Sequence, residues 1–99
     1  MREVHVISRK ALREFASEHT DAETPLDDWY RTARRSHWTS IADLRKTYPH
    51  ADAVGDLTVF NIGGNKYRLA TQISYQSGRI YIRRVMTHEE YSKEDWKKR

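Results

Sequence analysis

The fold is decided by residues 59–69, VFNIGGNKYRL, where two runs of β-branched and aromatic residues meet at a glycine pair. Glycines tolerate the positive φ of a tight hairpin, so the stretch predicts two antiparallel strands joined at Gly63-Gly64-Asn65. A third strand is predicted over residues 79–86, RIYIRRVM, because a turn signal, Gln76-Ser77-Gly78, precedes it. Three consecutive strands are therefore the expected centre of the protein.

Alternation along these strands separates core-facing side chains from those of an open face. In the second strand, the side chains that can line a core are Tyr67, Leu69, Thr71 and Ile73. In the third strand, the corresponding apolar side chains are Ile80, Ile82 and Met86. Pairing of the two strands then places four side chains on the open face: Lys66, Arg68, Tyr81 and Arg83. An ordinary solvated surface would show the same charges.

Two arginines carry specific expectations from this alternation. Arg68 is predicted to point away from the helices, where it would contribute to no core, so its removal should not affect folding. Arg84 falls on the core side of the pattern. We therefore expect it near the frayed end of the strand or beyond the helices.

A helix is predicted directly after the third strand. Thr87 and Glu90, three residues apart, match a capping box, and we expect the helix to run to about Trp96. His88 and Tyr91 would lie in its first turn on one side. A histidine, a phenol and several guanidinium groups would then converge at the end of the sheet. The alternative is that His88 is an ordinary first-turn residue and Tyr91 only packs the helix onto the sheet.

The upstream half is predicted to be mostly helical. Residues 3–7 alternate as a first strand, and residues 9–18 form an amphipathic helix behind the N-cap Ser8. Thr24 as N-cap and Pro25 at the first helical position open a second helix. A short third helix begins after Ser40, and residues 50–56 form a loop. Helices followed by strands indicate an α+β fold, with the helices packed on one face of an antiparallel sheet.

Composition restricts the class of protein. Ninety-nine residues suit one domain, residues 1–99, and 32% charged side chains indicate a very polar surface. No apolar run approaches a transmembrane helix and no signal peptide is visible, so we expect a cytoplasmic protein without membrane contact. The absence of cysteine excludes disulfides and thiolate metal sites. A net charge of +4 favours an anionic partner, either nucleic acid or an acidic protein.

Several blocks together resemble a known family. Residues 59–69, Tyr81-Ile82-Arg83 and residues 87–91 are similar to the HigB toxins of bacterial type II toxin–antitoxin modules, a branch of the RelE superfamily. The similarity extends upstream through residues 7–12 and 38–45, and so covers nearly the whole chain. It implies the same small α+β fold, with the active groups on the concave face of the sheet.

The resemblance also implies an activity and partners. HigB toxins cleave mRNA, usually in the ribosomal A site, and are neutralised by a helix-turn-helix antitoxin of the HigA type. By position, Arg68 corresponds to the phosphate-stabilising arginine of the superfamily. His88 and Tyr91 fall where relatives keep an acid/base group, although many relatives have an arginine and a more distant tyrosine there. Proton transfer is therefore left open between His88 and Tyr91.

RNA cleavage of this kind needs neither a metal nor a cofactor, because the ribose 2′-hydroxyl is the nucleophile. Histidine suits the proton transfers, and arginine can hold phosphate oxygens. Lys66 and Arg83 would follow the RNA backbone, and Tyr81 or Tyr91 could stack on a base or donate a proton. Two other classes fit the same charges: a nonenzymatic RNA- or ribosome-binding module, and a domain that binds an acidic protein.

Overall fold

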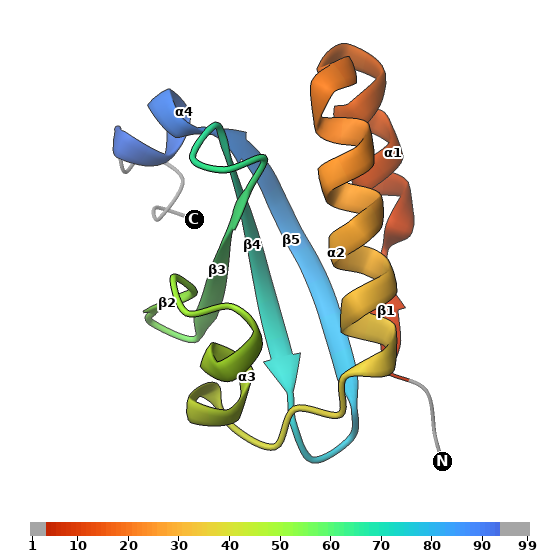
Figure 1. Cartoon of the computed structure of the whole chain (residues 1–99), viewed down its shortest axis with the longest axis vertical. Coiled ribbons are helices and arrows are strands. Elements are labelled where there is room, and N and C mark those ends of the chain that lie inside the picture. The colour runs from red at the N-terminus through yellow and green to blue at the C-terminus, as the bar shows by residue number, and fades with distance from the viewer. Residues whose placement is uncertain (1–3, 94–99) are drawn as a thin grey trace.

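The computed structural model describes residues 4–93 and contains four α-helices and a five-stranded sheet (Figure 1). The elements in chain order are β1 (His5–Ile7), α1 (Arg9–Glu18), the 3-10 turn η1 (Thr20–Ala22), α2 (Glu23–Arg35), α3 (Ile41–Thr47), β2 (Asp52–Val54), β3 (Leu57–Ile62), β4 (Tyr67–Ser74), β5 (Arg79–Thr87) and α4 (His88–Ser92). The strand order is β1-β5-β4-β3-β2. Within the described residues, the pairing of β1 with β5 is parallel, and the other strand pairs are antiparallel.

The predicted α+β fold is confirmed. α1 and α2 lie side by side along one face of the sheet, and α4 follows β5 at the end where the β3–β4 turn lies (Figure 1). The predicted helix over residues 9–18 is present with Ser8 as its N-cap, and the Ser40 hydroxyl caps α3 by accepting from the Asp43 N–H at 3.2 Å. None of the helices in residues 4–93 is long and apolar enough to cross a membrane.

Three upstream boundaries differ from the prediction, the first being β1, which begins at His5 and not at Glu3. α2 begins at Glu23 rather than after Thr24, because η1 leads directly into it and Ala22 already has helical φ and ψ. Pro25 still lies in the first turn, where its missing N–H has no intrahelical partner to lose. The segment predicted as a loop contains β2, which turns back through Gly55 (φ +62°) and adds a fifth strand beside β3.

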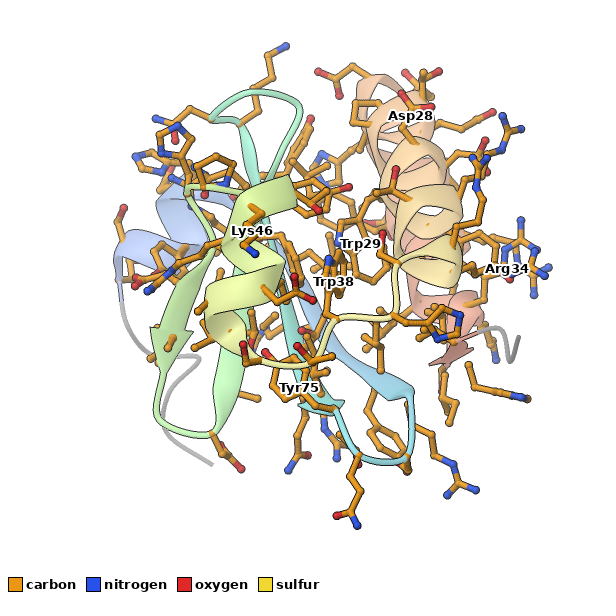
Figure 2. All side chains as sticks on the ribbon, turned by 60° about the horizontal axis from the view of Figure 1, so that its bottom comes forward. Asp28, Trp29, Arg34, Trp38, Lys46 and Tyr75 are labelled. Carbon is orange, nitrogen blue, oxygen red and sulfur yellow. The ribbon has the colours of Figure 1, made fainter. Side chains whose placement is uncertain are left out.

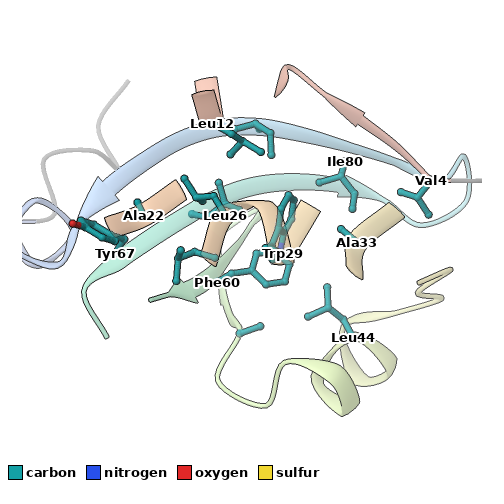
Figure 3. Close-up of a cluster of buried hydrophobic side chains, with 14 of the residues drawn as sticks. Val4, Leu12, Ala22, Leu26, Trp29, Ala33, Leu44, Phe60, Tyr67 and Ile80 are labelled. Carbon is teal, nitrogen blue, oxygen red and sulfur yellow. The ribbon is translucent and has the colours of Figure 1, made fainter. Parts of the chain in front are cut away.

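The main core lies between the sheet and the helices. Its buried members come from all three upstream helices and from β3, β4 and β5, as Figure 3 shows for Leu12, Trp29, Leu44, Phe60 and Ile80. Trp29 and Trp38 are 1% and 7% exposed, so both are core residues. In Figure 2 both indoles lie inside the molecule, whereas Arg34 projects outward from α2.

The opposite side of the sheet, called here the second face, carries a smaller apolar cluster. It consists of Leu57, Val59, Ala70 and Met86, with Val54 and Tyr91 packed against it.

A β-bulge explains why the alternation fails in β5. Ala70 pairs with Arg84 but Thr71 pairs with Ile82, so Arg83 is an extra residue that reverses the side-chain phase beyond it. Met86, expected in the main core, therefore lies on the second face, and Arg84, expected on the core side, lies there too. Both expectations were wrong because strict alternation cannot anticipate a bulge.

Candidate active site

The turn between β3 and β4 anchors the segment where the candidate residues meet. Gly63 and Gly64 have φ values of +62° and +70°, so the predicted tight turn is present. The backbone N–H of His88 donates to the Lys66 carbonyl at 2.8 Å, which joins this turn to the first residue of α4. The turn therefore fixes where His88 begins its helix.

The predicted capping box at the start of α4 is confirmed. The Thr87 hydroxyl accepts from the Glu90 N–H at 3.1 Å, and the Glu90 carboxylate accepts from the Thr87 N–H at 2.9 Å. The backbone N–H of Thr87 is the main reason that the pKa of Glu90 is lowered. α4 ends at Ser92 with Lys93 as its C-cap, so the helix is shorter than the prediction of about Trp96, and residues 94–96 lie outside the described residues. The capping box thus fixes the first turn of α4, which carries His88 and Tyr91.

Arg68 is buried on the second face and is only 7% exposed. Its Nη1 donates to two backbone carbonyls, those of Asn65 and Tyr67, both at 3.1 Å. Its Nη2 donates to the Asn65 Oδ1 at 2.6 Å and contacts the His88 Nδ1 at 3.1 Å. The expectation that Arg68 contributes to no core was therefore wrong, because the strand end and the side chains beside it enclose the guanidinium.

The contact with Arg68 involves the Nδ1 of the His88 ring. A guanidinium has only N–H donors, so a hydrogen bond here makes the His88 Nδ1 the acceptor. An accepting Nδ1 corresponds to the ring tautomer with its proton on Nε2. Because His88 is exposed, this arrangement leaves the Nε2–H available to a ligand.

Tyr91 completes the cluster from the same side of α4. The Arg68 guanidinium carbon lies 5.4 Å from the centre of the Tyr91 ring, within the range of a cation–π interaction. The Tyr91 hydroxyl donates to the Asp52 Oδ2 at 3.4 Å, so β2 also helps to orient it. Arg68, His88 and Tyr91, which the sequence predicted to converge, do meet in the fold.

Lys66 lies elsewhere than predicted. Its ammonium pairs with the Asp21 Oδ2 at 2.9 Å, and the Tyr67 hydroxyl donates to the Asp21 Oδ1 at 2.5 Å. Because Tyr67 belongs to the main core, Lys66 reaches toward the helical side rather than the second face. Its position was mispredicted because Lys66 belongs to the turn and not to β4. The Lys66 side chain nevertheless remains 67% exposed at the same end of the molecule.

Tyr81 and Arg83 do lie on the second face, but at a distance from the cluster. Tyr81 pairs with Gln72, four residues beyond Arg68 on β4, which corresponds to roughly 13 Å along the strand. Arg83 donates to the Gln72 Oε1 through Nε at 3.2 Å and through Nη2 at 2.5 Å, and it lies over the Tyr81 ring at 5.3 Å. These two residues form a separate basic and aromatic patch farther down the sheet.

Four residues that contact or neighbour the candidate site residues were not predicted from the sequence to do so. Asn65 was predicted only as a turn residue, Asp52 only as part of the loop over residues 50–56, and Asp21 was assigned no role. Arg84 was placed on the wrong side, although it is exposed and is an electrostatic neighbour of Glu90. No sequence signal identifies the first three, because each acts through a partner more than 20 residues away or through its own turn. Within residues 4–93, no group of three or more His, Cys, Asp or Glu side chains could hold a metal ion.

Comparison with known proteins identifies the family. A family model described as HigB_toxin, the RelE-like toxic component of a toxin–antitoxin system, matches residues 22–94. The mRNA interferase toxin HigB of Escherichia coli K12 is 33% identical over 91 residues, which cover 89% of this chain and 88% of that protein. The mRNA interferase HigB of Shigella flexneri has the same identity and coverage. A second mRNA interferase HigB, from Escherichia coli O6:H1, is 24% identical over 93 residues, covering 91% and 90%. The chain therefore belongs to the HigB family of RelE-like toxins.

Proposed function

We propose that this chain is the toxin of a type II toxin–antitoxin module and an endoribonuclease that cleaves mRNA. The observation that carries the proposal is the contact between the Arg68 guanidinium and the His88 ring, with Tyr91 beside it, in a member of this family. Three groups of different chemistry, a cation, an imidazole and a phenol, lie at one exposed end of the sheet. A cation can stabilise negative charge on a phosphate, and an imidazole or a phenol can transfer a proton, so the cluster offers the groups that RNA cleavage uses.

The reaction uses the RNA's own nucleophile. The ribose 2′-hydroxyl attacks the adjacent phosphorus, and the bond to the 5′-oxygen of the next nucleotide breaks. The 2′-hydroxyl proton must leave, and the departing 5′-oxygen must receive a proton. The products are a 2′,3′-cyclic phosphate and a free 5′-hydroxyl. Because the RNA supplies its own nucleophile, the reaction needs no metal and no cofactor.

The cluster supplies the remaining requirements. The positive charge of Arg68 stabilises negative charge that develops on the phosphate. His88 and Tyr91 are the two candidates for proton transfer, and both lie beside the Arg68 guanidinium. Because all four terminal N–H groups of Arg68 already have protein partners, a phosphate that contacts them directly must displace one of these partners.

RNA binding extends beyond the cluster in this proposal. Arg83 and Tyr81 form the patch farther along the second face, where a cation and an aromatic ring suit the backbone and a base of a single strand. Lys66, whose carbonyl accepts from the His88 backbone N–H, provides a further exposed cation near this end of the sheet. The substrate is mRNA in the ribosomal A site, the inhibitor is a helix-turn-helix antitoxin of the HigA type, and the protein acts in the cytoplasm.

The experiment is RNA cleavage by the purified chain, with and without translating ribosomes and in the presence of EDTA. We expect shortened mRNA with cyclic phosphate and 5′-hydroxyl ends, unaffected by EDTA. Gln76→Ala, which removes an amide from the turn at the opposite end of the sheet, serves as a control that should cleave normally. Binding to RNA or ribosomes without cleavage under any of these conditions would instead identify a nonenzymatic binding module.

A further inference from the structure

The Arg68 guanidinium has its terminal hydrogen-bonding capacity filled within the protein. Its two terminal nitrogens carry four N–H bonds, and four protein acceptors receive them: the carbonyls of Asn65 and Tyr67, the Asn65 Oδ1 and the His88 Nδ1. A side chain held in this way is rigid and mostly hidden from a ligand. The group that Arg68 can influence most directly is the His88 ring, which its Nη2 contacts.

Asn65 provides two of these four acceptors. Its carbonyl and its side-chain oxygen bind different nitrogens of the guanidinium, at 3.1 and 2.6 Å, so together they fix the plane of the group. The next residue, Lys66, accepts from the His88 backbone N–H, so the same turn also fixes the start of α4. Asn65 therefore lies at the point where Arg68 and His88 are positioned relative to each other.

We propose that Asn65 is a positioning residue that orients Arg68 so that its guanidinium holds the His88 ring with the proton on Nε2. The inference rests on the proposed function, and it specifies how His88 enters the reaction. In this tautomer His88 presents an N–H donor to a phosphate oxygen. Removal of the 2′-hydroxyl proton by Nε2 would first require the ring proton to move to Nδ1, where the Arg68 donor already lies.

The tautomer can be read without RNA. We would record ¹⁵N chemical shifts of the His88 imidazole by NMR in the full-length protein, with assignment by His88→Gln. The expected wild-type result is an unprotonated Nδ1 and a protonated Nε2. Asn65→Ala should shift the ring toward a mixture of tautomers, whereas Asn65→Asp keeps an oxygen acceptor for Arg68 and should retain the wild-type pattern.

Cleavage provides the second measurement. Asn65→Ala should lower the single-turnover rate by about 10- to 100-fold, as expected when a hydrogen bond to a charged group is lost. RNA affinity should change little, and Asn65→Asp should cleave faster than Asn65→Ala. Gln76→Ala, a matched amide removal in the β4–β5 turn, should leave both the rate and the His88 tautomer unchanged.

The outcomes separate the inference from the proposed function. A wild-type His88 protonated on Nδ1 would overturn the inference, as would an Asn65→Ala variant whose tautomer and cleavage rate both match wild type. A purely structural role would lower the unfolding midpoint of Asn65→Ala but leave the tautomer of the folded protein unchanged, which would also overturn it. If the wild-type chain cleaves no RNA, the proposed function fails, and the NMR comparison alone then decides whether Asn65 positions the ring.

Discussion

On the face that carries α1 and α2, the sheet contributes Phe60, Leu69 and Ile80 to a continuous apolar core. On the second face, a cluster of only four buried residues shares its space with the guanidinium of Arg68. The first face is stabilised mainly by the removal of apolar surface from water. The second also depends on specific hydrogen bonds, because a buried cation without partners would be strongly destabilising.

The difference shows how a small domain can hold a charged group rigidly. The larger core stabilises the sheet, and the hydrogen bonds to Arg68 then offset much of the cost of burying it. Its neighbour His88 is exposed and can meet a ligand. Stability is therefore expected to depend mostly on the first face and cleavage mostly on the second. Each prediction below tests this division.

The largest expected effect concerns cleavage. His88→Gln should lower the cleavage rate by roughly a hundred- to ten-thousandfold, the range typical of proton-transfer groups, while RNA or ribosome binding is kept. Its unfolding midpoint should stay close to wild type, because His88 is exposed. Single-turnover cleavage and thermal unfolding of the same preparations measure both effects.

Tyr91→Phe is the companion variant. It removes the hydroxyl that donates to Asp52 but keeps the ring beside Arg68. If His88→Gln cleaves normally while Tyr91→Phe is inactive, the proton-transfer role belongs to the phenol and the assignment to His88 is wrong.

The next prediction compares how much each face contributes to the free energy of unfolding, by making the same Leu→Ala substitution on both faces. Leu69 is 0% exposed in the main core, and Leu57 is 8% exposed in the second cluster. Leu69→Ala should cost toward the upper end of the about 2–5 kcal/mol usual for this substitution, and Leu57→Ala toward the lower end. Urea unfolding measures both. Equal losses would mean that the second cluster stabilises the fold as much as the main core does.

The sequence predicted some features of the two faces of the sheet better than others. Leu12 and Ala16 in α1, and Leu26, Trp29 and Ala33 in α2, recur at helical spacing, so the helices and their buried faces were predictable from periodicity. The convergence of Arg68, His88 and Tyr91 was also predictable, because the hairpin and the capping box are local signals. Those signals identified where the site lies.

The site's finer geometry was not predictable from local patterns. The bulge at Arg83 reverses the phase of β5, and RIYIRRVM indicates it only indirectly, through an arginine, Arg84, at a position that alternation assigns to the core. The burial of Arg68 depends on Asn65 and on side chains of α4, and the Lys66 position depends on Asp21, 45 residues away. Such contacts arise only when the chain has folded, so alternation placed Lys66 on the wrong side.

A smaller, double effect is expected at Arg68. Arg68→Ala should lower cleavage by a hundredfold or more, about 3 kcal/mol, through loss of the charge beside the phosphate and of the contact with His88. It should also destabilise the fold by about 1–3 kcal/mol, because buried acceptors lose their partner. Arg83→Ala is the matched control: its side chain is exposed, so stability should change by less than about 0.5 kcal/mol. An Arg68→Ala protein as stable as wild type would show that the buried guanidinium contributes nothing to the fold.

The smallest effect concerns the link between the hairpin turn and the helical side. The Tyr67 hydroxyl, followed by the Lys66 ammonium, lowers the pKa of Asp21 below its ordinary value of 3.8. A carboxyl whose pKa is lower in the folded than in the unfolded protein stabilises the fold above the unfolded value, and this contribution disappears as the pH falls through the folded value. Wild type should therefore be slightly more stable than Asp21→Asn at pH 5–7, and the difference in urea midpoint should shrink below about pH 4. Because Asp21 is exposed, the whole effect should be small. A difference that is the same at pH 6 and pH 2.5 would show that the charge of Asp21 does not stabilise the turn, and that packing of Tyr67 alone connects it to the helical side.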